Sequence, residues 1–199
     1  MSEELEIEFK NKLTAQEYYK LLDYYNVEDK DFFEQENHYF DTALWELKMI
    51  QAGLRIRILE NSGELTLKTP FNSHLLETTD YLSLAESKSL LLKNKIDSTG
   101  HVAKKLRELN IDPTTVHLIG SLKTKRFEKQ TSKGLIVLDQ SFYGNKTDFE
   151  LEFEVKDAMT GKIDFEVFLK KHHLKKAPSQ NKIVRMIKES LKTNKNQQK

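Results

Sequence analysis

The feature that most constrains the fold of this chain is a set of alternating segments whose polar positions carry charges of one sign. Three segments have apolar residues on one face and like charges on the other: Glu6 and Glu8 in residues 5–9, Arg55 and Arg57 in 54–58, and Glu150, Glu152 and Glu154 in 149–155. Alternation with period two is typical of β-strands. Side chains two residues apart on one strand face are separated by about 6.5–7 Å. Like charges at that distance repel each other unless opposite charges lie among them.

Two arrangements of these charged faces have to be weighed. They could be solvated outer faces, on which salt reduces the repulsion to roughly a few tenths of a kcal/mol. Alternatively, they could point into a shared interior, with the apolar faces lying outward beneath helices. We favour the second arrangement because three separate strands each carry an unmixed sign. A closed barrel built in this way would enclose a polar tunnel with an acidic wall and a basic wall.

The remaining pattern predicts an α+β fold. Strands are also predicted at residues 65–68, 122–128 and 135–139, with weaker signals at 35–40 and 75–81. Capping boxes at Thr14 and Ser83 predict helices to about residues 25 and 95, and a third helix is predicted from about Thr42 to a C-cap at Gly53. Further helices are predicted at 99–109, 162–171 and 179–191. Hairpin-like neighbours, such as 54–59 with 64–69, indicate a mostly antiparallel sheet.

Composition removes several classes of protein. The chain has no cysteine, which excludes disulfide frameworks, Cys-ligated metal centres and thiolate nucleophiles. A formal net charge of +1, without a basic aromatic patch, argues against a nucleic-acid partner. The acidic start and the lack of any long apolar run argue against a leader or a membrane span, so we expect a cytoplasmic protein. We expect a single domain over residues 1–192, followed by a disordered tail at 193–199.

The two charged walls predict a ligand. Clustered carboxylates without interleaved cysteine or histidine are hard oxygen ligands that suit Mg²⁺ or Mn²⁺. Arginine and lysine facing them would bind phosphate oxygens, arginine through paired hydrogen bonds and lysine as a point charge. The ligand that satisfies both walls is a metal-bound polyphosphate.

A series of motifs adds specificity to this interpretation. In chain order they are Glu6-Ile7-Glu8-Phe9-Lys10, Asn37-His38-Tyr39-Phe40-Asp41-Thr42, Leu54-Arg55-Ile56-Arg57, Leu65-Thr66-Leu67-Lys68, Leu138-Asp139 and Phe149-Glu150-Leu151-Glu152-Phe153-Glu154. This series resembles the CYTH domain of the triphosphate tunnel metalloenzymes, which include thiamine triphosphatases, inorganic triphosphatases and class IV adenylate cyclases. The resemblance implies an eight-stranded, closed antiparallel β-barrel with a charged interior and helices packed outside. Ser179 to Lys182 resembles the family's C-terminal segment, where a helix plugs one end of the tunnel.

The resemblance also implies roles for individual residues. The residues that match the family's metal side are Glu6, Glu8, Glu77, Asp139, Glu150 and Glu152. Those that match its substrate side are Lys10, Arg55, Arg57, Lys68, Arg126 and Lys182. Lys10, Glu8 and Arg57 are the expected catalytic residues, with Lys10 positioning either the nucleophilic water or a phosphate oxygen.

The expected activity is hydrolysis of a small triphosphate, either inorganic triphosphate or an organic one such as thiamine triphosphate, with Mg²⁺ or Mn²⁺. Two alternatives stay open at this point. One is an adenylate cyclase or nucleoside triphosphatase, and the other is a polyphosphate-binding module without catalysis. The oligomeric state is also open, with a homodimer among the options.

Overall fold

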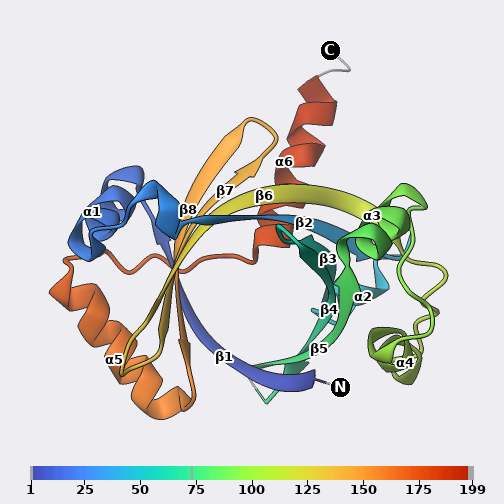
Figure 1. Cartoon of the computed structure of the whole chain (residues 1–199), viewed down its shortest axis with the longest axis horizontal. Coiled ribbons are helices and arrows are strands. Elements are labelled where there is room, and N and C mark those ends of the chain that lie inside the picture. The colour runs from blue at the N-terminus through green and yellow to red at the C-terminus, as the bar shows by residue number, and fades with distance from the viewer. Residues whose placement is uncertain (1, 73, 197–199) are drawn as a thin grey trace.

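A computed structural model, which describes residues 2–72 and 74–196, shows eight strands closed into an antiparallel barrel (Figure 1). The order around the barrel is β1-β5-β4-β3-β2-β6-β7-β8, and β1 closes it by pairing with both β5 and β8. The predicted α+β barrel is therefore confirmed, and both weak strand signals are real strands. The strands are β1 (Ser2–Leu13), β2 (Phe33–Asp41), β3 (Gly53–Ile58), β4 (Ser62–Phe71), β5 (His74–Ser83), β6 (His117–Gln130), β7 (Leu135–Tyr143) and β8 (Lys146–Val155).

The helices lie outside the barrel. They are α1 (Ala15–Tyr25), the 3₁₀ helix η1 (Asp29–Asp31), α2 (Glu46–Met49), α3 (Leu84–Leu92), α4 (His101–Glu108), α5 (Ala158–Lys171) and α6 (Lys182–Asn196). Helices α1 and α5 cover one side, and α2, α3 and α4 cover the opposite side (Figure 1). Helix α6 begins beside the barrel and extends away from it. No helix in residues 2–72 and 74–196 combines the length and the apolar character needed to cross a membrane.

The hydrophobic core occupies two layers between the barrel wall and these helices. In the first layer, Leu138 and Leu151, both fully buried on outer strand faces, pack with Tyr18 of α1 and Phe165 of α5. In the second layer, the outer faces of β3 and β4 pack against α4, and this layer includes Leu54, Ile56, Leu65, Leu67, Val102 and Leu106. Each such aliphatic side chain contributes about 1.5–3 kcal/mol on burial. Because the apolar faces point outward, the inward faces are left to polar and charged residues.

Two helices begin where the sequence predicted. Thr14 accepts a hydrogen bond from the backbone N–H of Glu17, and the Glu17 carboxylate accepts one from the backbone N–H of Thr14. Ser83 and Glu86 repeat this reciprocal arrangement at the start of α3. Each capping box pairs two backbone N–H groups that the helix itself leaves without partners.

The predicted helix from Thr42 to a C-cap at Gly53 is wrong. Helix α2 has a single turn, Glu46–Met49, and Gly53 is the first residue of β3. The buried carboxylate of Asp41 accepts hydrogen bonds from the backbone N–H groups of Thr42, Leu47 and Lys48, so the chain folds around this side chain and does not start a long helix. Gln51, with φ of 58°, adopts the left-handed conformation that was assigned to Gly53.

Helix α6 packs over one end of the barrel. Its residue Met186 is buried against Tyr39, Leu122 and Tyr143, which come from three different strands. The helix continues to Asn196, so the backbone of residues 193–196, which the sequence assigned to a tail, is helical. Residues 197–199 of the predicted tail lie outside the described residues.

The position of the core outside the barrel leads to a stability prediction. Leu151→Ala is expected to lower the free energy of unfolding by about 2–5 kcal/mol, because it leaves a cavity between β8 and the flanking helices. Leu5, which is 45% exposed on β1, is the matched control, and Leu5→Ala is expected to change stability by less than about 0.5 kcal/mol. Urea unfolding followed by circular dichroism measures both values. Equal losses in the two variants would contradict this placement of the core.

Candidate active site

The barrel encloses a cavity of about 420 Å³. All eight strands contribute to its lining, together with the N-terminal turn of α6. Most of the residues predicted for the site line this cavity: Glu6, Glu8, Lys10, Arg55, Arg57, Lys68, Glu77, Arg126, Glu152 and Lys182. The other two, Asp139 and Glu150, are buried in the wall behind it.

Lys10 joins the acidic residues of β1 to those of β8. In the strand register it lies opposite Glu152, and its ammonium group is 2.8 Å from Glu8 and 3.5 Å from Glu152. Burial alone would lower the pKa of Lys10, but Glu152 and Glu8 raise it above its ordinary value. Lys10 is therefore a permanently protonated donor at neutral pH.

Lys68 makes a similar bridge between β1 and β5. Its ammonium group donates to both oxygens of Glu6, at 2.8 and 2.7 Å, and also pairs with Glu77. Burial raises the pKa of Glu6, and the neighbouring charge of Glu77 raises it further. Burial opposes ionisation of Glu77 as well, but Lys68 holds the pKa of Glu77 below its ordinary value.

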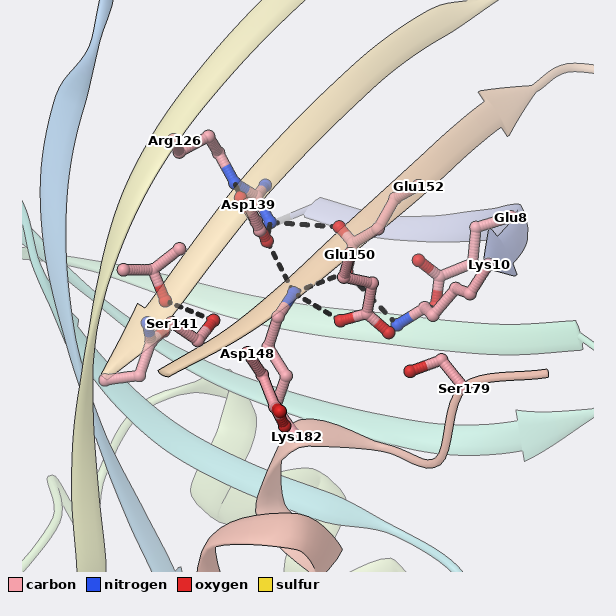
Figure 2. A network of polar contacts seen from close by, with 12 residues as sticks. Glu8, Lys10, Arg126, Asp139, Ser141, Asp148, Glu150, Glu152, Ser179 and Lys182 are labelled. Atoms are coloured by element: carbon pink, nitrogen blue, oxygen red, sulfur yellow. Dashed lines mark hydrogen bonds and ion pairs between the residues drawn. The ribbon is translucent and has the colours of Figure 1, made fainter. Parts of the chain in front are cut away.

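A dense charge network lies at the end of the tunnel where α6 begins (Figure 2). Lys182, at the start of α6, is 2.5 Å from Asp139, 2.5 Å from Glu152 and 3.2 Å from Glu150. Arg126 donates two hydrogen bonds to Asp139, at 2.7 and 2.6 Å, and one to Glu152 at 2.9 Å. Burial would raise the pKa values of Asp139 and Glu152, but the adjacent cations, led by Arg126 for Asp139 and Lys182 for Glu152, lower both. These carboxylates are thus ionised and already neutralised by the protein.

The arginines of β3 are compensated less closely, although Arg55, after Lys68, helps to hold the pKa of the buried Glu77 below its ordinary value. Arg55 makes no ion pair or hydrogen bond with any side chain in the described residues, and its Nε is buried without a partner. Arg57 lies 3.8 Å from Glu64, and its Nε donates to the neutral side chain of Asn37. Burial, together with repulsion from Arg55 and Arg126, lowers the pKa of Arg57 to about 9. The basic wall therefore carries positive charge that an anion in the cavity would stabilise.

The acidic wall carries the opposite excess. Glu154 lies directly across from Glu8 in the strand register, and like charges placed opposite each other destabilise a sheet. Burial and the nearby charges of Glu152, Glu6 and Glu8 raise the pKa of Glu154 to about 7. Burial likewise raises the pKa of Glu8, with further contributions from Glu152 and Glu6. Glu154 was not among the predicted site residues, although its place in the alternating motif of β8 could have identified it.

These carboxylates fit a divalent cation in their chemistry. Within residues 2–72 and 74–196, no three acidic or histidine side chains converge in a geometry ready to hold a metal ion. The spaces between the carboxylates are instead filled by the ammonium groups of Lys10, Lys68 and Lys182. The donors are all carboxylate oxygens, which Mg²⁺ and Mn²⁺ prefer. Burial and repulsion from Glu152, Glu6 and Glu8 raise the pKa of Glu154, and a divalent cation beside it would relieve that repulsion.

Helix α6 is held in place by a residue that the sequence did not single out. Arg185 is 2.8 Å from Asp148 and 2.7 Å from Glu150, both on β8. Ser179, in the segment before α6, makes its only hydrogen bond among the described residues to the backbone of Gln180, at 3.4 Å (Figure 2). Arg185 and Lys182 therefore fix the helix against the barrel, and Ser179 does not contribute a contact to the charge network.

Comparison with known proteins agrees with this architecture. The family model of the CYTH domain matches residues 4–187, which is nearly the whole chain. The chain belongs to the CYTH family. It is 43% identical over 193 residues to the curated protein "Putative triphosphatase YjbK" of Bacillus subtilis (strain 168), covering 97% of this chain and 100% of that protein.

Two solved structures show the CYTH fold in other chains. A protein of Bacillus halodurans described as a "putative adenylate cyclase" is 35% identical, with a TM-score of 0.88 over 93% of this chain and 98% of that one. The protein HpAC1 of Hippeastrum, described as revealing a dominant triphosphatase activity, is 20% identical, with a TM-score of 0.77 over 93% and 96% of the two chains. The second likeness establishes the shared fold alone.

The raised pKa of Glu154 makes a prediction about stability in the CYTH tunnel. The pKa of Glu154 is about 7 in the folded state and 4.5 ordinarily, so between these two pH values the folded chain binds more protons than the unfolded chain. The free energy of unfolding should then fall as pH rises from about 4.5 to about 7. Glu154→Gln is expected to lose less stability than the wild type over this range in EDTA, as measured by urea unfolding. Exposed Glu34→Gln is the control, and a pH dependence of Glu154→Gln equal to that of the wild type would contradict the assignment.

Proposed function

We propose that this CYTH protein hydrolyses a small triphosphate inside its tunnel, with a divalent cation, Mg²⁺ or Mn²⁺, as cofactor. The observation that carries the proposal is the incomplete charge balance of an enclosed cavity. Arg55 and Arg57 leave an excess of positive charge on one wall, and Glu154, which lies across from the Lys10-paired Glu8, leaves an excess of negative charge on another. A triphosphate with a divalent cation is complementary to both. The 43% identity to a protein named as a triphosphatase supports the same activity.

The cation would be held by carboxylates of β1 and β8. Glu6, Glu8, Glu152 and Glu154 line the cavity, so they are the first candidates, and the cation would take the place of the lysines that now pair with the first three. Glu77, which the resemblance assigns to the same role, also lines the cavity and pairs with Lys68. Asp139 and Glu150, assigned likewise, are buried behind the lining and pair with Arg126, Lys182 and Arg185. The bound cation supplies neutralisation of phosphate charge and a lowered pKa for a bound water.

The cationic side chains have roles that follow from their surroundings. Arg55 and Arg57 are free to donate hydrogen bonds to phosphate oxygens, where guanidinium groups bind in pairs of contacts. Lys68, Arg126 and Lys182 contribute positive potential while they stay paired with carboxylates. Lys10 remains protonated, so it acts as a donor that orients a water or a phosphate oxygen and not as a base.

We also propose that residues 1–192 act as a single domain. The barrel closes only because β1, at the start of the chain, pairs with β8, and α6 then packs over the barrel end. Removal of β1 would open the barrel, and removal of α6 would uncover one end of the cavity.

Substitutions at the two walls test the proposed activity. Glu8→Gln and Arg57→Ala are each expected to lower kcat for inorganic triphosphate by about 10²–10³-fold or more, because each removes charge stabilisation that strengthens in the transition state. Phosphate release is measured with Mg²⁺ and with Mn²⁺, and circular dichroism verifies the fold. Glu34→Gln and Arg107→Ala, on the outer surface, are the matched controls. EDTA should abolish wild-type turnover, and unchanged rates in both tunnel variants would contradict the assignment.

The likeness to a structure described as a "putative adenylate cyclase" favours one alternative reaction, in which the ribose 3′ oxygen of ATP attacks the α-phosphorus. Among the described residues that line the cavity, the aromatic ones are Tyr39, which is 7% exposed, and Tyr81, which is 75% exposed. Neither Tyr39, packed in the core at the α6 end, nor Tyr81, open to solvent, forms an enclosed stacking site for a purine. Incubation with ATP and Mn²⁺ is therefore expected to give no cyclic AMP by chromatography, and formation of cyclic AMP would establish the cyclase instead.

A further inference from the structure

Two arginines that line the tunnel are each held by a hydrogen bond from Nε to the side chain directly opposite, and the two partners differ in charge. Arg126 lies opposite Asp139 in the register of β6 and β7, and its Nε donates to Asp139 Oδ1 at 2.7 Å. Arg57 lies opposite Asn37 in the register of β2 and β3, and its Nε donates to Asn37 Oδ1 at 3.1 Å. Because a guanidinium group has only donors, the atom of Asn37 that faces it must be the amide oxygen. Asparagine and aspartate have nearly the same shape, so the two partners differ mainly in charge.

The charge of the hydrogen-bond partner determines whether each arginine can bind an anion. Asp139 binds Arg126 through both oxygens and cancels its charge, and Arg126 also donates to Glu152. Asn37 fixes the direction of the Arg57 guanidinium through one hydrogen bond and leaves its charge in place. Asn37 is 2% exposed, so this contact is shielded from bulk solvent.

The other groups that face Arg57 do not neutralise it either. Arg55 and Arg126 are cations that repel it, Tyr39 presents a phenol group, and Glu64 is 3.8 Å away and half-buried. Arg57 is therefore held in one orientation with most of its charge available to a ligand. A preorganised charged donor of this kind binds an anion without first breaking an ion pair.

We propose that Asn37 is a positioning residue that orients Arg57 toward the triphosphate while leaving its positive charge uncancelled. This inference rests on the proposed function, because it assigns Arg57 to phosphate binding. It adds Asn37 of β2 to the site. Asn37 serves this role because its amide is uncharged and leaves the charge of Arg57 in place. The carboxylate in the equivalent position beside Arg126 makes that arginine part of the buried network of the barrel.

The test compares Asn37→Asp and Asn37→Ala with the wild type, using calorimetric binding of inorganic triphosphate in EDTA and steady-state hydrolysis with Mn²⁺. Asn37→Asp is expected to weaken binding by about tenfold or more, a loss of about 1.4 kcal/mol, and to raise KM more than it lowers kcat. Asn37→Ala should weaken binding less, because it removes the orientation of Arg57 but adds no competing anion. Asn61→Asp, which adds the same charge at an exposed turn outside the tunnel, is the control and should bind like the wild type.

The pH dependence separates this role from simple packing. Wild-type binding should weaken as pH rises through the pKa of Arg57, which is lowered to about 9. A carboxylate at position 37 raises the pKa of Arg57, so the alkaline loss of binding in Asn37→Asp should move to higher pH, although its affinity at pH 7 is lower. Asn37→Ala should show no such upward movement.

The outcomes distinguish this inference from the proposed function. If Arg57→Ala weakens triphosphate binding but folded Asn37→Asp binds with wild-type affinity and an unchanged pH profile, the role of Asn37 is overturned and the tunnel activity stands. If neither the wild type nor any variant binds triphosphate, both proposals are overturned. Melting temperature verifies the fold, and a loss of binding in Asn37→Ala equal to or greater than that in Asn37→Asp would show that packing, and not charge, is what Asn37 supplies.

Discussion

Mutual neutralisation of buried charges across the barrel is the interaction on which the rest of this structure depends. Removing an ion from water costs several kcal/mol, and the protein recovers that cost only when opposite charges and hydrogen bonds surround it. Lys10, Lys68 and Lys182 each lie among carboxylates from two strands, so they join β1 to β8, β4 to β1 and β5, and α6 to β7 and β8. With its interior committed to these pairs, the barrel places its apolar side chains outside, beneath two groups of helices.

Function follows from the charges that this network does not neutralise. A fully balanced interior would be inert toward ions, because any ligand would have to displace an existing pair. The excess positive charge at Arg55 and Arg57 and the excess negative charge at Glu154 lie on different walls of one cavity. The same separation of charge makes the folded chain less stable than it could be, as expected where binding sites hold strained or repelling groups.

The sequence predicted the barrel well because its main signal is local. Alternation of period two and the unmixed sign of each polar face are both properties of a few neighbouring residues, and the order of motifs resembled the CYTH domain. The α2 segment was predicted wrongly because its conformation depends on the buried side chain of Asp41, whose contacts with three backbone N–H groups no periodicity reveals. Strand register was equally out of reach, and register is what places Glu154 opposite Glu8 and Asn37 opposite Arg57.

The side-chain contacts separate the predicted site residues whose charge is available to a ligand from those that are paired within the barrel wall. Residue type alone does not make this distinction. Arg57 and Arg126 are both arginines that point into the barrel, yet Arg57 faces the amide of Asn37 and Arg126 faces the carboxylate of Asp139. Asp139 and Glu150 belong to the predicted acidic set, but they lie in the wall behind the cavity, bound by Arg126, Lys182 and Arg185. How much of each charge is available to a ligand depends on these contacts.

The most direct test of the account is a crystal structure of the protein with Mn²⁺ and a non-hydrolysable imido analogue of triphosphate. We expect the analogue inside the barrel, with phosphate oxygens at Arg55 and Arg57, and an anomalous manganese signal among the carboxylates of β1 and β8. An analogue bound only on the outer surface, or an empty tunnel at saturating concentrations of both, would contradict it.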